Sequence, residues 1–239
     1  MTEPTRRDSA LDLIKWLAML TMLLDHLRLL WPDAHGLFIP GRLAFPLFCL
    51  AIAANVARSR PGQLLSEGNT RYLGWMLGFA LISELVYRPV SPLGTLNVMF
   101  TLLLGLLIAW GVHHRNTLSA GLALGASVVA AWLDEQLMYG LLGCLLPAAL
   151  LLAIQRPGPM WLLPALLSVA VNTRSSLWAR AMDVDTYSLA VMGMAFIAPL
   201  FGLWLLRATF KGNVWPVRHW AYWFYPVHLG VLQALRKLM

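Results

Sequence analysis

Ionisable residues occur inside apolar stretches near both ends of this 239-residue chain. Asp25 and His26 follow Lys15 by ten and eleven residues, and His228 follows His219 by nine residues. A neutral imidazole titrates near physiological pH and can take a proton from an amine or hydroxyl that attacks an acyl carbon. These residue types therefore suit acyl transfer, with His26 as the catalytic general base and with Asp25 and His228 as catalytic residues that position or polarise the reacting groups.

The spacing also predicts how deep these residues lie. An α-helix rises about 1.5 Å per residue, so Asp25 and His26 would lie roughly 15–17 Å beyond Lys15, and His228 at a similar depth beyond His219. If both stretches cross a bilayer in the same direction, the two histidines reach one layer near its midplane. A charge there costs at least about 2.5–3.5 kcal/mol, so we expect these side chains to face a bundle interior or a hydrated cavity.

The sequence leaves the partner of His26 open. Asp25 and His26 are adjacent, so on a helix their side chains point about 100° apart and cannot easily pair. We predict that Glu84 orients His26 as a catalytic carboxylate, and that Asp25 binds Arg42. Alternatively, Asp25 pairs with Arg28 three residues later, and each buried histidine hydrogen-bonds to a neighbouring helix.

Arg42, Glu84 and Asn97 are expected in the outer half of the membrane, where Arg42 and Asn97 would bind substrate or cofactor. Structural roles are open for all three. Arg42 can anchor at the outer headgroups, and Glu84 can pair with Arg42 or Arg88. Asn97 can cap a helix or form a hydrogen bond between helices.

A basic cluster, His113, His114 and Arg115, is expected in an inner loop. It could bind an anionic headgroup or a cofactor phosphate, and interface anchoring is the alternative. Cys49 and Cys144 lie in apolar runs without disulfide or metal-ligand spacing, so we expect them to pack and expect no metal site.

The composition indicates an integral membrane protein. Of the residues, 59% are hydrophobic and 12% are charged, which leaves too little polar surface for a soluble protein of this size. The net charge of +7 arises from Lys and Arg placed singly or in pairs beside apolar runs, so we expect no nucleic-acid partner. We expect membrane lipids around a single domain over residues 1–239.

Apolar runs bounded by charged residues, Pro and Gly predict an all-α bundle of about nine transmembrane helices, within a range of eight to ten. The expected spans are 11–31, 42–58, 71–88, 94–112, 117–133, 138–154, 160–176, 187–207 and 216–236. The seventh is the weakest, because Asn172, Thr173 and Arg174 cut it short. Basic residues, beginning with Arg6 and Arg7, are more frequent in the expected inner segments, which predicts a cytoplasmic N-terminus.

Five motifs together resemble the TraX family in order and spacing. They are Leu13–His26, Gly41–Phe48, Asn97–Gly105, Tyr139–Gly140 and Phe224–Leu229. Each motif is weakly specific alone, but five in register, with polar residues embedded in apolar helices, are fairly specific. Asp25, His26, Arg42, Asn97 and His228 fall on family motif positions, whereas Glu84 does not.

The TraX family is named for an inner-membrane enzyme that N-acetylates conjugative pilin, and it resembles membrane acyltransferases with an early histidine and a late Tyr-x-x-His pattern. The resemblance implies a bacterial inner-membrane acetyltransferase that uses acetyl-CoA as co-substrate. The acceptor would be the N-terminal amine of a pilin or another envelope molecule. Two other classes remain open: a proton-coupled transporter or flippase, and a non-enzymatic protein of envelope assembly.

Overall fold

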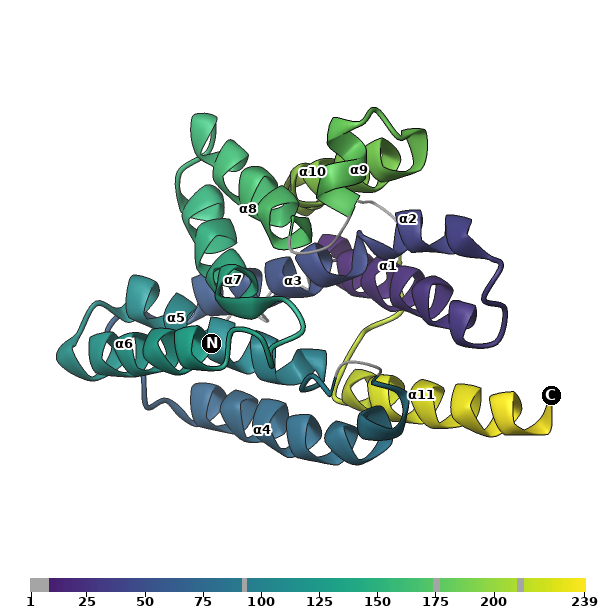
Figure 1. Ribbon diagram of the computed structural model, residues 1–239. Coiled ribbons are helices and arrows are strands. Elements are labelled where there is room, and N and C mark those ends of the chain that lie inside the picture. The colour runs from purple at the N-terminus through teal and green to yellow at the C-terminus, as the bar shows by residue number, and fades with distance from the viewer. Residues whose placement is uncertain (1–8, 92–93, 174–176, 210–212) are drawn as a thin grey trace.

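The computed structural model describes residues 9–91, 94–173, 177–209 and 213–239 (Figure 1). These ranges form helices, with an isolated β-bridge between Leu96 and Leu137 and no longer strand. The prediction of an all-α protein is confirmed. The α-helices of the described residues are α1 (Ser9–His26), α2 (Phe38–Gly41), α3 (Ala44–Arg58), α4 (Glu67–Tyr87), α5 (Val98–His114), α6 (Thr117–Trp132), α7 (Gly140–Gln155), α8 (Leu162–Asn172), α9 (Leu177–Met182), α10 (Thr186–Arg207) and α11 (Trp220–Leu238).

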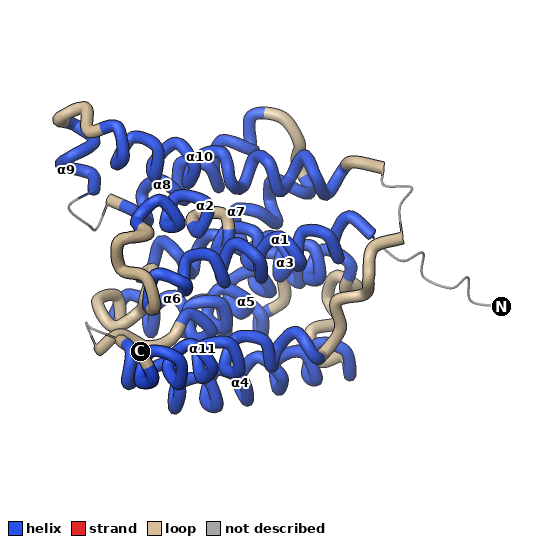
Figure 2. The backbone as a smooth tube through the Cα atoms, turned by 90° about the vertical axis from the view of Figure 1, so that its right-hand side faces the viewer, coloured by secondary structure: helices blue, strands red, loops and turns tan. Residues whose placement is uncertain are grey.

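Helix α3 lies at the centre of the bundle. Eleven of its fifteen residues are buried, and it contacts α1, α5, α7 and α10. Both ribbon views place α4 and α11 along one side of this centre and α8, α9 and α10 along the other (Figures 1 and 2). An apolar helix that is covered on all sides has no polar face to turn toward solvent, which accounts for the apolar sequence of α3 up to Asn55 and Arg58 in its last turn.

The number of membrane spans is not confirmed. Within the described ranges, two helical segments are long and apolar enough to cross a bilayer, His35–Arg58 and Thr186–Arg207. Four others are apolar but shorter, at Val98–His114, Thr117–Trp132, Gly140–Gln155 and Pro159–Asn172. A 17-residue helix extends only about 25 Å, which is less than the roughly 30 Å hydrocarbon layer.

Two predictions rest partly on residues outside the described ranges. Arg6 and Arg7, which support a cytoplasmic N-terminus, precede the first described residue, and Arg174 with the end of the expected span 160–176 falls in a gap. Within the described part of that span, α8 ends at Asn172.

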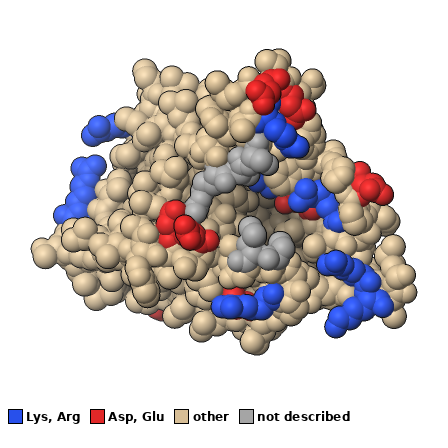
Figure 3. Space-filling model, viewed as in Figure 1, with Lys and Arg blue, Asp and Glu red and all other residues tan. Residues whose placement is uncertain are grey.

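The exterior carries many large apolar side chains. Leu85 and Trp132 are 79% and 81% exposed, and Leu81, Leu124 and Val128 are exposed as well. On the face drawn in Figure 3, charged residues form small separate groups on a surface made mostly of other residues. Such apolar area exceeds what water tolerates on a soluble monomer, so it is consistent with a lipid environment.

Helices α1 and α11 run side by side in the same direction. The segment that leads into α11 is fixed to the first half of α1, where the Val217 N–H donates to Asp12 Oδ1 over 3.1 Å. The Trp16 indole N–H donates to the Trp215 carbonyl over 3.0 Å. Because both helices begin at the same end of the bundle, residues at similar distances along α1 and α11 lie at the same level.

Helices α5 and α7 approach closely at a glycine. A Cβ atom on Gly105 would lie 2.7 Å from Pro147 Cγ and 3.0 Å from the Cys144 carbonyl oxygen. A proline ring and a helix backbone are rigid, so they cannot move away from the added Cβ as a flexible side chain can. Gly121 in α6, by contrast, has no atom within 4 Å of such a Cβ.

We therefore expect Gly105→Ala to destabilise the protein by about 1–3 kcal/mol through overpacking. The melting temperature of the detergent-solubilised protein should fall by about 2–8 °C. Gly121→Ala is the matched control and should leave the melting temperature unchanged or raise it by a few degrees, because alanine is the better helix former. Equal melting temperatures for the two variants would contradict this packing.

Candidate functional site

The two histidines from opposite ends of the chain are in direct contact. His26 Nδ1 lies 2.6 Å from His228 Nε2, and the two ring centroids are 4.9 Å apart. His26 is the last residue of α1, and His228 lies in the middle of α11. The expectation that they share one layer is confirmed, because the parallel course of α1 and α11 carries both to the same level.

The hydrogen bonds assign the protons on this pair. His228 Nδ1 lies 2.6 Å from the Phe224 carbonyl oxygen, which can only accept, so His228 Nδ1 carries a proton. In neutral His228 the other nitrogen, Nε2, is then an acceptor, and His26 Nδ1 must be the donor. His26 Nε2 consequently keeps its lone pair. The pair presents His26, held in one tautomer by His228, as a group that can accept a proton.

Asp25 points away from His26 and toward two arginines. Its carboxylate lies 3.4 Å from the Arg42 guanidinium and 3.2 Å from that of Arg28. Arg42 also donates to Asn172 Oδ1 over 3.2 Å, and its guanidinium lies 3.8 Å from the centroid of the Phe38 ring. Both expected partners of Asp25 are thus present. The contacts of Asp25, Arg42 and Asn172 join α1 to the end of α2 and to α8.

Glu84 does not orient His26, so that expectation is corrected. Its carboxylate accepts hydrogen bonds from the Arg88 side chain over 2.7 Å and from the Asn97 side chain and backbone over 2.8 and 3.0 Å. Asn97 in turn caps α5, with its side-chain oxygen accepting from the Met99 N–H. Glu84 and Asn97 together fix the start of α5 against α4, which was their structural alternative.

The basic cluster at the end of α5 is also not placed as an anion site. His113 and His114 are buried; His113 Nε2 donates to the Ser59 carbonyl over 2.8 Å, and His114 Nε2 lies 3.4 Å from the Asn69 amide. Arg115 alone is exposed. His113 thus joins α5 to the residue that ends α3, His114 lies against the first turn of α4, and both imidazoles are buried away from the surface.

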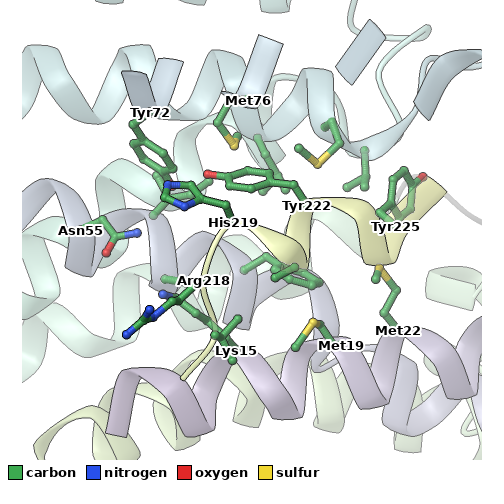
Figure 4. Close-up of a pocket in the computed structure, with 18 residues that line it drawn as sticks. Lys15, Met19, Met22, Asn55, Tyr72, Met76, Arg218, His219, Tyr222 and Tyr225 are labelled. Atoms are coloured by element: carbon green, nitrogen blue, oxygen red, sulfur yellow. The ribbon is translucent and has the colours of Figure 1, made fainter. Parts of the chain in front are cut away.

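A cavity of about 330 Å³ lies between α1, α3, α4, α5 and α11 (Figure 4). Arg218 and His219 are exposed, so the cavity reaches the surface at the end where Lys15 also lies. At its other end the lining residues Met22, Met99 and Tyr225 are buried. Met22 precedes His26 by one helical turn, so the closed end lies next to the histidine pair.

Neither this cavity nor the position of Tyr225 in it is evident from the sequence. Tyr225 precedes His228 by three residues, so the two share one face of α11, with ring centroids 5.8 Å apart. The Tyr-x-x-His spacing in the sequence could have indicated that Tyr225 lies near the site. Within the described residues no group of three or more His, Cys, Asp or Glu side chains is arranged to hold a metal ion.

These features define a helical protein with an apolar exterior and a cavity that extends from its surface toward a pair of histidines. The sequence profile described as TraX protein matches residues 10–236, so this chain belongs to the TraX protein family. Two similar curated proteins, both named Protein TraX and from Escherichia coli and Escherichia coli strain K12, are each 28% identical over 232 residues. The alignment covers 94% of this chain and 86% of each relative. No solved structure matches the chain.

Proposed function

We propose that this protein is an acetyltransferase of the bacterial inner membrane that moves an acetyl group from acetyl-CoA to an envelope-side acceptor. The contact between His26 and His228, one helical turn beyond Met22 at the buried end of the cavity, is the observation that carries the proposal. A base held in one tautomer beside a pocket that is open to one side matches what acyl transfer requires.

In this proposal His26 Nε2 is the general base. It takes the proton from the acceptor as the acceptor attacks the acetyl carbon, and His228 stabilises the imidazolium that forms by accepting the hydrogen bond from His26 Nδ1. Asp25 is not in contact with the imidazole and instead holds Arg42. Asp25, Arg42 and Asn172 are therefore positioning residues next to the base.

The cavity suits the long, partly anionic acetyl-CoA molecule. Lys15 and Arg218 supply positive charge at its open end, where phosphate groups would bind. Methionines line the passage toward the closed end and give an adaptable apolar wall for a flexible chain, namely Met19, Met22, Met76 and Met99. These residues replace His113, His114 and Arg115 as the proposed cofactor site.

The proposed orientation places the open end and the N-terminus on the cytoplasmic side, where acetyl-CoA is made. The acceptor would approach His26 from the opposite side of the bundle. An amine such as the N-terminus of a pilin, or a hydroxyl of another envelope molecule, could give up a proton to His26 in the same way. The proposed acceptor is therefore an amine or hydroxyl of an envelope molecule.

We expect His26→Ala to lower acetyl transfer by about 10²- to 10⁴-fold, because the attacking group loses its proton acceptor. The measurement is the incorporation of labelled acetyl from acetyl-CoA into candidate envelope acceptors by purified protein in detergent. His35→Ala is the matched control, since His35 is exposed in the short 3-10 helix before α2 and its hydrogen bonds to Asp33 and Tyr187 involve its backbone atoms. Equal activity of the two variants, or no transfer by the wild type, would favour the transporter or assembly classes.

We expect Arg218→Glu to raise the KM for acetyl-CoA by about tenfold or more with little change in kcat. The substitution turns an attractive contact with the co-substrate phosphates at the open end into a repulsive one. Arg236→Glu, near the other end of α11, makes the same charge change far from the open end and should leave the KM unchanged. An unchanged KM in Arg218→Glu would remove the cavity as the donor site.

A further inference from the structure

The hydroxyl of Tyr225 is a buried polar group without a hydrogen bond. The residue is 5% exposed, and no partner with normal hydrogen-bond geometry lies near its oxygen among the described residues. A buried donor left unsatisfied costs about 1–3 kcal/mol, and native proteins keep few of them. The hydroxyl is therefore a candidate for a partner that arrives with a ligand.

Tyr225 lies where the reaction would take place. It lines the closed end of the cavity, and its ring centroid is 6.3 Å from that of His26. In Figure 4 it stands at the opposite end of the pocket from Lys15 and Arg218, with its oxygen turned away from them. A group that enters from the open end and extends along the cavity would reach the Tyr225 ring last, and the hydroxyl lies just beyond it.

The first turn of α5 faces the same place. Val98 begins this 17-residue helix and also lines the cavity. The neighbouring N–H groups are used, since Asn97 donates to Glu84 and Met99 donates to the Asn97 side chain. The Val98 N–H lies near the Tyr225 hydroxyl and makes no hydrogen bond of normal geometry among the described residues. A helix N-terminus carries partial positive charge that favours a negative group beside it.

We propose that the Tyr225 hydroxyl and the Val98 N–H form an oxyanion site for the acetyl group of a thioester, an inference that rests on the proposed function. As the acceptor nitrogen or oxygen bonds to the acetyl carbon, His26 Nε2 takes its proton and the carbonyl oxygen becomes negative. Tyr225 and Val98 donate hydrogen bonds to that oxygen. The C=O bond then re-forms, the C–S bond breaks, and the leaving thiolate receives the proton from His26.

In this proposal, proton transfer and stabilisation of the oxyanion are carried out by different residues. His26 handles the proton, and Tyr225 with Val98 handles the negative charge on the carbonyl oxygen. The cluster of Glu84 and Asn97 acquires a role in this account, because it holds the first turn of α5 and hence the Val98 N–H in place. Glu84 and Asn97 are positioning residues, since neither is required to touch the acetyl group.

The test compares Tyr225→Phe with Tyr87→Phe in labelled acetyl transfer. Removing one donor to a developing oxyanion lowers kcat by about 10²- to 10³-fold, so Tyr225→Phe should show this loss with a KM for acetyl-CoA near the wild-type value. Tyr87 lies at the end of α4, and its hydroxyl is already paired with that of Thr95 at 2.9 Å. Tyr87→Phe should keep kcat within about twofold of wild type.

Thermal unfolding of the same variants provides the second readout. An unpaired hydroxyl adds nothing to stability, so Tyr225→Phe should melt at or above the wild-type temperature. A lower melting temperature with unchanged kcat would make the hydroxyl structural and overturn the oxyanion site. An active wild type with equally active Tyr225→Phe overturns this inference alone, whereas a wild type without transfer overturns the proposed function as well.

Discussion

The hydrogen bond between His26 and His228 is the interaction on which the rest of the site depends. It joins the end of α1 to the middle of α11, and it forms because the segment before α11 is tied to the first half of α1. The bond to the Phe224 carbonyl fixes the proton on His228, which in turn fixes the proton on His26. One backbone carbonyl thus determines which nitrogen of the other histidine is free to accept a proton.

The surrounding helices keep this pair at the closed end of a cavity. α3 fills the centre of the bundle, and α4 and α5 complete the wall that faces α1 and α11. Asp25, next to His26 in sequence, points the other way and binds Arg42. A carboxylate so close to the base could have competed for its hydrogen bond, but the helix geometry separates the two side chains and leaves the imidazole to His228.

The sequence predicted the helical class from its apolar runs and the family from its motifs. It predicted that the two histidines share one level, because spacing along a helix determines depth. It also predicted the pairing of Asp25 with Arg42. It misplaced Glu84 and the pair His113 and His114, since a polar residue in an apolar run has the same appearance whether it caps a helix or serves a reaction. The buried environment of Tyr225 depends on how five helices pack, and helix periodicity does not encode that.

Nitrogen-15 NMR of protein made with ¹⁵N-labelled histidine and placed in lipid bilayers can locate the protons on the two imidazoles. At neutral pH we expect His26 to carry its proton on Nδ1 and to have an unprotonated Nε2. We also expect a coupling from His26 Nδ1 to His228 Nε2 across their hydrogen bond, with His228 protonated on Nδ1. A proton on His26 Nε2, or two imidazoles that show no coupling, would rule out this hydrogen-bonded pair.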